Sequence, residues 1–255
     1  MLEKTSVLEL GKVFSYPLEV LEVVREEIEI FRAWEFDFPG RNAASYDKAI
    51  TKLCDALGPF SVRGWHCARL MPHEISNIRS DGLRLPCREF LAKRLGALLK
   101  MCVLTDSQSQ LLYDESQVED SNRKGMIWFC FYKPHYAGEN GISRLLSYWG
   151  GEAVYWAFED DPAVGELLRS IGIPVVVEVD VPIDSLRSAH KVAVSVIRSY
   201  LKSLGEKVVE PINVEHYSVR DVNSRNIRCI HEFPSEDFKE ITGCSRWRKP
   251  LFSIT

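Results

Sequence analysis

Apolar residues in the first part of the chain recur at the three- and four-residue spacing of a helix. This spacing runs from Leu18 to Phe31 and again from Ala44 to Leu57. The sequence FPGRN, at residues 38–42, separates the two stretches and contains proline and glycine, which interrupt helices. We therefore predict an N-terminal helical region, residues 1–58, followed by a second domain, residues 59–255.

After residue 59 the pattern changes to short apolar runs bounded by turn residues, which is typical of strands. The predicted strands cover residues 65–70, 126–132, 153–158, 174–181, 215–219 and 228–233. The predicted helices cover residues 72–80, 88–101, 142–149 and 162–171, and the polar segment 105–123 is expected to be a surface loop. Because the helices do not alternate regularly with the strands, we predict an α+β fold.

The composition is that of an ordinary globular protein, with 45% hydrophobic and 27% charged residues. No apolar stretch reaches the roughly 20 residues needed to span a bilayer, and MLEKTSVLELGKVF lacks the apolar core of a signal peptide. The seven cysteines never form a C-x-x-C pair, which disfavours a disulfide scaffold or a structural zinc site. We expect a soluble, cytoplasmic protein with no membrane partner.

The charge and the placement of possible metal ligands disfavour two further classes of function, nucleic-acid binding through a general positive charge and metal binding. The net charge of −4 gives no general attraction for nucleic acid, and the only compact basic group is Arg246, Arg248 and Lys249. His66, Cys67 and His73 have side chains that bind metals, but no fourth partner is evident. We therefore predict no metal site.

Three segments far apart in the sequence carry the candidate chemistry: GWHCARL at residues 64–70, WGGEAVYWAF at 149–158 and NVEHYSVRDVNSRNIRCIHEF at 213–233. In this order, each on a predicted strand, they resemble the ADP-ribosyltransferase superfamily, in its histidine–tyrosine–glutamate branch of diphtheria toxin and the poly-ADP-ribose polymerases. The resemblance covers about residues 60 to 235. It implies a split β-sandwich of two small facing sheets, here with an N-terminal helical region.

The resemblance also implies that NAD is the substrate and gives roles to individual residues. His66 matches the histidine that binds the NAD ribose, and Cys67 stands where the family often has a glycine whose backbone approaches the nicotinamide amide. Tyr155 matches the tyrosine that stacks on nicotinamide. Glu215 matches the catalytic glutamate, which stabilises the oxocarbenium-like transition state. Arg69 is a candidate for binding an NAD phosphate, with a salt bridge to an acidic residue as its alternative.

Each of these residues also has a simpler structural interpretation. His66 would be a structural histidine, Tyr155 a core residue and Glu215 a solvated acid, in which case Glu152 is the rival catalytic acid. Another branch of the superfamily uses an arginine, a Ser-Thr-Ser strand and an E-x-E or Q-x-E loop. No Ser-Thr-Ser occurs here, and Asn213 stands two residues before Glu215, so that branch is disfavoured.

The activity implied by the resemblance is cleavage of NAD and transfer of ADP-ribose to a macromolecular acceptor, RNA or protein. A looser likeness to bacterial toxin and phage-defence transferases of the CmdT kind, which modify RNA, implies a role in a toxin–antitoxin or anti-phage system. An antitoxin or inhibitor protein is then an expected partner. The alternatives are an NAD glycohydrolase, with water as acceptor, and a non-enzymatic module that binds NAD or ADP-ribose.

Overall fold

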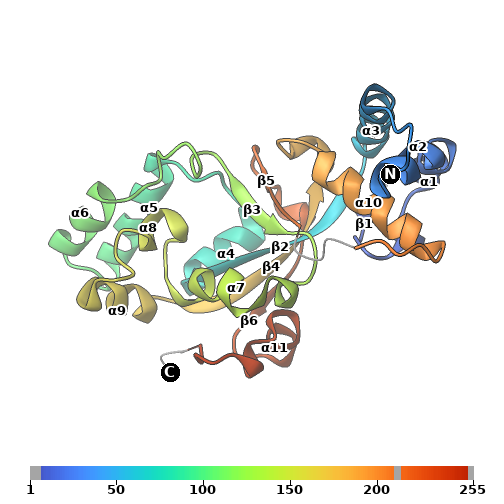
Figure 1. Cartoon of the computed structure of the whole chain (residues 1–255). Helices are drawn as coiled ribbons and strands as arrows, with labels where there is room; N and C mark the ends of the chain where they lie inside the picture. Colours follow the sequence, from blue (N-terminus) through green and yellow to red (C-terminus); the bar gives the residue numbers. More distant parts are fainter. Residues whose placement is uncertain (1–6, 210–213, 252–255) are drawn as a thin grey trace. The chain divides into compact units, whose positions relative to one another are not determined.

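The computed structural model describes residues 7–209 and 214–251, which form an α+β fold, as predicted (Figure 1). The strands are β1 (Val7–Leu8), β2 (Ser61–Leu70), β3 (Ile127–Cys130), β4 (Ile173–Pro182), β5 (Glu215–Ser218) and β6 (Ile227–Glu232). The helices are α1 (Leu18–Glu26), α2 (Ile28–Glu35), α3 (Ala43–Leu57), α4 (Pro72–Asp81), α5 (Arg88–Lys100), α6 (Asp106–Asp114), α7 (Gly138–Ser147), α8 (Glu152–Tyr155), α9 (Pro162–Ser170), α10 (His190–Ser203) and α11 (Glu236–Thr242). Five of the six predicted strands and all four predicted helices therefore have counterparts.

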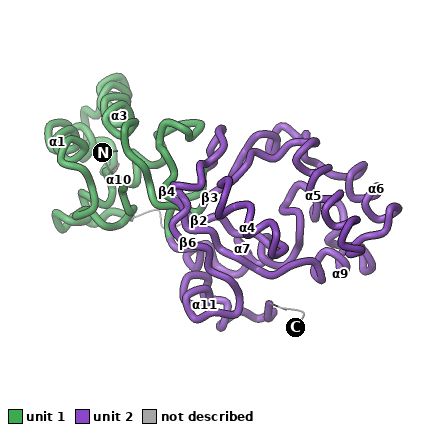
Figure 2. The backbone as a smooth tube through the Cα atoms, turned by 180° about the vertical axis from the view of Figure 1, so that it is seen from behind, with its two compact units in different colours: residues 1–64, 130–132, 180–216 green, residues 65–129, 133–179, 217–255 purple. Residues whose placement is uncertain are grey.

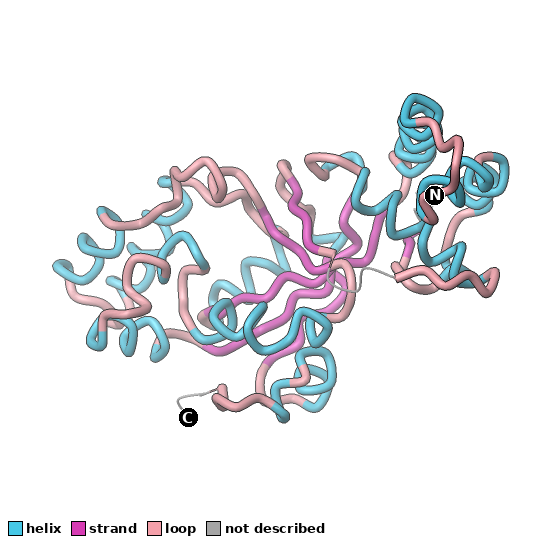
Figure 3. Tube along the Cα trace, viewed as in Figure 1, coloured by secondary structure: helices cyan, strands magenta, loops and turns pink. Residues whose placement is uncertain are grey.

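The strands of the described residues join in one six-stranded sheet (Figure 3). Its order is β5-β3-β2-β4-β6, and the short strand β1 pairs with β2 in parallel. Strands β4 and β6 are antiparallel, with Val175 opposite Glu232 and Val177 opposite Ile230. The expectation of two facing sheets is therefore wrong for the described residues, because the long strands β2 and β4 bond to each other and to a further strand on each side.

The chain divides into two compact units (Figure 2). The first unit contains residues 1–64, 130–132 and 180–216, and the second contains residues 65–129, 133–179 and 217–255. Strands β2, β3, β4 and β5 each contribute residues to both units. The N-terminal helices thus share a unit with α10, a helix inside the range that we assigned to the second domain.

The first unit is a small helical cluster in which α1, α2 and α10 all contact α3. The predicted N-terminal helices are confirmed, and FPGRN is the break between α2 and α3. Helix α3 begins after Asn42, whose side chain accepts a hydrogen bond from the Ser45 amide at 2.9 Å, a typical N-cap. Phe31, Leu53 and Val196 are almost completely buried in this unit, so the apolar faces of its helices form its core.

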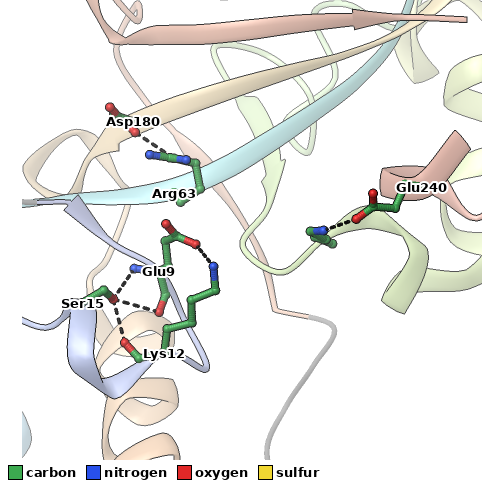
Figure 4. A network of polar contacts seen from close by, with 7 residues as sticks. Glu9, Lys12, Ser15, Arg63, Asp180 and Glu240 are labelled. Carbon is green, nitrogen blue, oxygen red and sulfur yellow. Dashed lines mark hydrogen bonds and ion pairs between the residues drawn. The ribbon is translucent and has the colours of Figure 1, made fainter. Parts of the chain in front are cut away.

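Polar side chains add to the packing of the first unit (Figure 4). Arg63 on β2 donates to the Asp180 carboxylate on β4 at 2.8 Å, and both side chains are mostly buried. Near the N-terminus the Ser15 hydroxyl accepts from the Glu9 amide at 2.9 Å and donates to the Lys12 carbonyl at 2.7 Å. The ion pair connects the two strands, and the Ser15 contacts close the turn that precedes α1.

Turn chemistry explains both a success and a failure of the predictions in the second unit. Helix α4 ends at Gly82, as predicted; its φ is +86°, and a Cβ there would lie 1.9 Å from the Val222 carbonyl oxygen. The predicted loop 105–123 is wrong, because it contains α6. Thr105 and Gln108 each accept a hydrogen bond from the other's amide, at 3.2 and 2.9 Å, and this capping box begins the helix.

The segment WGGEAVYWAF was predicted to carry a strand at residues 153–158, and this is wrong. It forms the short helix α8, entered through Gly150 and Gly151, which have φ values of +93° and +70°. A Cβ on Gly150 would lie 2.6 Å from that of Val154, so the turn requires glycine. A short apolar run has the same appearance in a buried helix and in a strand, which explains the error.

The second unit has its own hydrophobic cluster, to which α5, α6, α8 and α9 contribute. Its most buried members are Leu98, Leu112, Trp149 and Leu168. Among the helices of the described residues, none has both the length and the apolar character needed to cross a membrane.

Candidate functional site

His66 lies on β2, in the second unit, and its ring is held in one orientation by β3. Its Nδ1 atom is 2.9 Å from the backbone carbonyl oxygen of Trp128. A carbonyl oxygen can only accept a hydrogen bond, so Nδ1 must carry the proton. The neutral ring therefore presents Nε2 as a hydrogen-bond acceptor.

The surroundings of His66 keep the imidazole neutral. Burial lowers the pKa of His66; the hydrogen bond to Trp128 opposes this effect, and the positive charge of Arg94 lowers the pKa further. The Phe129 ring meets the imidazole edge-on, with 6.0 Å between the ring centroids. A neutral, oriented imidazole of this kind can accept a hydrogen bond from a ligand hydroxyl.

Arg94, on α5, belongs to a buried polar network beside His66. Its Nε atom donates to the Glu74 carboxylate at 2.5 Å, and its guanidinium carbon lies 4.4 Å from the centre of the Trp149 ring. The other Glu74 oxygen accepts from the Trp149 indole at 2.9 Å and from the Met71 amide at 2.8 Å. These contacts hold the guanidinium in a single orientation.

Glu74 keeps its charge inside this network. Burial alone would raise the pKa of Glu74, but the charge of Arg94 and the three hydrogen bonds outweigh burial, so the pKa is lowered. The network connects two of the three sequence segments, because Arg94 acts on His66 and also stacks on Trp149. Sequence reasoning missed Glu74 and Arg94. The available signal was an acid three residues into a helix that starts with Pro72.

Tyr155 lies on α8 and is only 2% exposed. Its ring centroid is 5.3 Å from that of Tyr148, and the Arg144 guanidinium carbon lies 5.8 Å from its centre. It packs in the same hydrophobic cluster as Trp149. No hydrogen bond or ring contact joins Tyr155 to His66 in the part of the chain that the structure describes. Its stacking on nicotinamide stays a prediction, and in this structure the ring is a core residue.

Arg69 and Cys67 are also buried, at 2% and 7% exposure. Arg69 donates from Nε to the Ile171 carbonyl at 2.9 Å and from Nη1 to the Leu146 carbonyl at 3.5 Å. These carbonyls lie at the C-terminal ends of α9 and α7, where a cation satisfies acceptors and complements the helix dipole. Burial lowers the pKa of Arg69 to about 10. The structure thus gives Arg69 a structural task that the sequence did not suggest.

Glu215 belongs to the first unit, at the start of β5. It borders a cavity of about 330 Å³ that His190, Lys191 and Arg198 of α10 also line. Burial raises the pKa of Glu215, and the charge of Lys191 opposes this effect. The Lys191 ammonium donates to the backbone oxygen of Glu215 at 3.0 Å, and Arg198 pairs with Glu35 at 2.8 Å. The cavity therefore combines one exposed carboxyl, whose pKa is raised, with three basic side chains.

The three residues proposed from the sequence are divided between the units, His66 and Tyr155 in the second and Glu215 in the first. The rival acid Glu152 is exposed at the start of α8 and pairs with Arg123 at 3.2 Å. Asn213 lies outside the described residues. Within residues 7–209 and 214–251, no group of three or more His, Cys, Asp or Glu side chains is arranged to hold a metal ion.

Comparisons with protein-family models, with curated proteins and with solved structures found no match for this chain. A functional proposal therefore rests on the residues themselves and on their geometry.

Proposed function

We propose that this protein is an NAD-dependent ADP-ribosyltransferase whose described strands form one sheet instead of the two facing sheets that the resemblance implied. The observation that carries the proposal is the pairing of a neutral, oriented His66 with the immobilised guanidinium of Arg94. Both features lie in the second unit. Arg94 connects the segments around His66 and Trp149, which resemble the superfamily's motifs, because it acts on His66 and stacks on Trp149.

The chemistry of NAD matches these two groups. Its ribose hydroxyls are donors for the Nε2 acceptor of His66, and its diphosphate is an anion suited to a planar guanidinium. Glu74 occupies only the Nε atom of Arg94, and among the described residues no hydrogen bond is found to either terminal nitrogen. Both terminal nitrogens are therefore available for a bidentate contact with a phosphate.

The resemblance, rather than the placement of the two units, assigns the chemical step to Glu215. The bond between nicotinamide and the ribose C1′ breaks with its electron pair going to nicotinamide, and an acceptor nucleophile attacks C1′. The Glu215 carboxylate stabilises the positive charge that develops on the ribose and takes the proton of the acceptor. A solvent-accessible carboxyl with a raised pKa suits the second of these tasks.

The finer parts of the proposal follow the resemblance. The acceptor is a macromolecule, RNA or protein, and the biological role is that of a toxin or anti-phage effector controlled by an inhibitor protein. Tyr155 keeps its proposed contact with nicotinamide, which would require its ring to become exposed when NAD binds. The basic side chains of His190, Lys191 and Arg198 in the cavity beside Glu215 are consistent with an anionic acceptor such as RNA.

Incubation with NAD labelled in the adenylate part, and with separate pools of RNA, DNA and protein, tests the proposal. We expect nicotinamide release and transfer of the label to RNA or protein. Nicotinamide release without any labelled pool would instead identify a glycohydrolase. Binding of NAD with no release in any pool would identify a binding module, and neither binding nor release would overturn the proposal.

A further inference from the structure

A second group of reactive side chains lies in the second unit, away from the proposed NAD-binding residues. It consists of Cys229 and His231 on β6 and Glu178 on the neighbouring strand β4. Cys229 and His231 are two residues apart on one strand, so they share a face of the sheet. Glu178 is the register partner of Cys229 and is therefore on the same face.

In this group the His231 ring lies between the Glu178 carboxylate and the Cys229 thiol and contacts both. His231 Nε2 is 3.1 Å from a Glu178 carboxylate oxygen, and His231 Nδ1 is 3.9 Å from the Cys229 sulfur. Because the carboxylate accepts, the neutral imidazole carries its proton on Nε2. Nδ1 then faces the thiol with an unshared electron pair.

The three side chains also differ in solvent exposure. The side chains of His231 and Glu178 are only 10% and 19% exposed, whereas Cys229 is exposed. A thiol, a histidine that can take its proton and a carboxylate that orients the histidine form the arrangement of an activated nucleophile. The thiol is the member that an external reagent can reach.

We propose that Cys229 is a reactive thiol that is alkylated by uncharged α,β-unsaturated carbonyl compounds, with His231 as its general base and Glu178 as the residue that positions His231. The sulfur forms a bond to the β-carbon while its proton passes to His231 Nδ1. The π electrons move toward the carbonyl, and the resulting enolate then takes the proton back from the imidazolium at its α-carbon. Atoms and electrons balance without an oxidant or a leaving group.

The charges around Cys229 favour an uncharged reagent. Burial raises the pKa of the Cys229 thiol, and the charges of Glu178 on β4 and Asp237 on α11 add to this effect. The Ile230 backbone hydrogen bond and the charge of Arg79 on α4 oppose it. The resting group is therefore the protonated thiol, which needs a base to react, and negatively charged reagents are repelled by the two carboxylates.

Labelling with a limiting amount of N-ethylmaleimide, followed by peptide mass spectrometry, tests this proposal on the full-length protein. Cys102 is the internal reference because it is also an exposed free cysteine. At about pH 7 we expect Cys229 to react about tenfold faster than Cys102, since general-base assistance typically contributes at least about a hundredfold before the raised pKa is discounted. A Cys229 rate equal to or below that of Cys102 would overturn the proposal.

Two variants separate base catalysis from mere exposure. We expect His231→Gln to lower the Cys229 rate about tenfold and Glu178→Gln to lower it less, with the Cys102 rate unchanged in both. In His231→Gln the Cys229 rate should continue to rise through the alkaline range, as the thiol ionises without help. His73→Gln, which changes a half-buried histidine of α4, is the matched control. An unchanged Cys229 rate in both His231→Gln and Glu178→Gln would contradict the proposal. If neither variant folds, the comparison of the Cys229 and Cys102 rates in the wild type decides the test.

Discussion

The surroundings of His66 and those of Glu215 differ in their charged groups, which form a buried ion pair beside His66 and border a cavity beside Glu215. Beside His66, the Arg94 and Glu74 side chains are paired, 17% and 8% exposed, and held by a tryptophan. Beside Glu215, one carboxyl with a raised pKa borders an open cavity with basic side chains. The first arrangement is suited to binding a ligand in one orientation, and the second to exchanging protons and stabilising charge.

Glu215→Gln tests the proposed catalytic role of Glu215 and should have the largest effect, on turnover. Removing a group that stabilises transition-state charge typically lowers turnover by about 10² to 10³. We expect nicotinamide release to fall by that factor while NAD affinity, measured by calorimetry, stays within about twofold. Near-normal release in Glu215→Gln would move the catalytic role to another acid, and Glu152→Gln is the next variant to measure.

Glu74→Gln tests whether the buried ion pair with Arg94 stabilises the surroundings of His66. Removing one partner of a buried ion pair typically destabilises a protein by about 3 to 5 kcal/mol, because the other charge is left without compensation. We expect a corresponding loss in the free energy of unfolding, measured by urea denaturation. Glu166→Gln changes an exposed acid of α9 and should leave the stability within about 0.5 kcal/mol. Equal stability of the two variants would show that the network does not hold Arg94.

His66→Ala should have a smaller effect, on binding. Loss of one hydrogen bond to a ribose hydroxyl corresponds to about 1.4 kcal/mol, or roughly a tenfold increase in the dissociation constant for NAD. Lys93→Gln, at an exposed position next to Arg94 on α5, is the matched control and should bind NAD as the wild type does. Calorimetric titration of both variants checks this, and identical affinities would exclude His66 from the NAD site.

The smallest expected effect is a dependence of stability on pH. The pKa of His66 is lowered in the folded state, so folding favours the neutral ring. The stability gained from this is complete above the unfolded pKa of about 6.5 and is lost as the pH falls from there toward the folded pKa. We expect His66→Gln to become more stable relative to the wild type between about pH 6.5 and pH 5, measured by thermal unfolding. A constant difference over this range would contradict the lowered pKa.

Local signals predicted much of the fold. The helices at 72–80 and 162–171 begin at Pro72 and Pro162, as the structure confirms, and the strand at 174–181 is β4. Helix α6 was missed although Thr105 and Gln108 form a capping box, which shows that the cap was a better signal than the polar composition. Pairing between distant strands leaves no mark in a single sequence, so one sheet could not be distinguished from two.

The candidate site was predicted less completely than the fold. Motif resemblance singled out His66 and Glu215, which the structure places beside groups that shift their pKa values. It could not indicate Arg94 or Glu74, because their importance comes from burial and from contacts between α4, α5 and Trp149. Tyr155 was placed on a strand because a short apolar run has the same appearance in a strand and in a buried helix, whereas it lies in the core on a short helix.

Nicotinamide release from NAD by the purified full-length protein is the most direct measurement of the central claim. The assay compares wild type, His66→Ala, Arg94→Gln and Lys93→Gln, each with RNA and protein acceptors present. The account predicts release by the wild type and by Lys93→Gln, and a rate at least about tenfold lower for His66→Ala and Arg94→Gln at an NAD concentration well below the dissociation constant. No release by the wild type with any acceptor, or equal release by all four proteins, would contradict it.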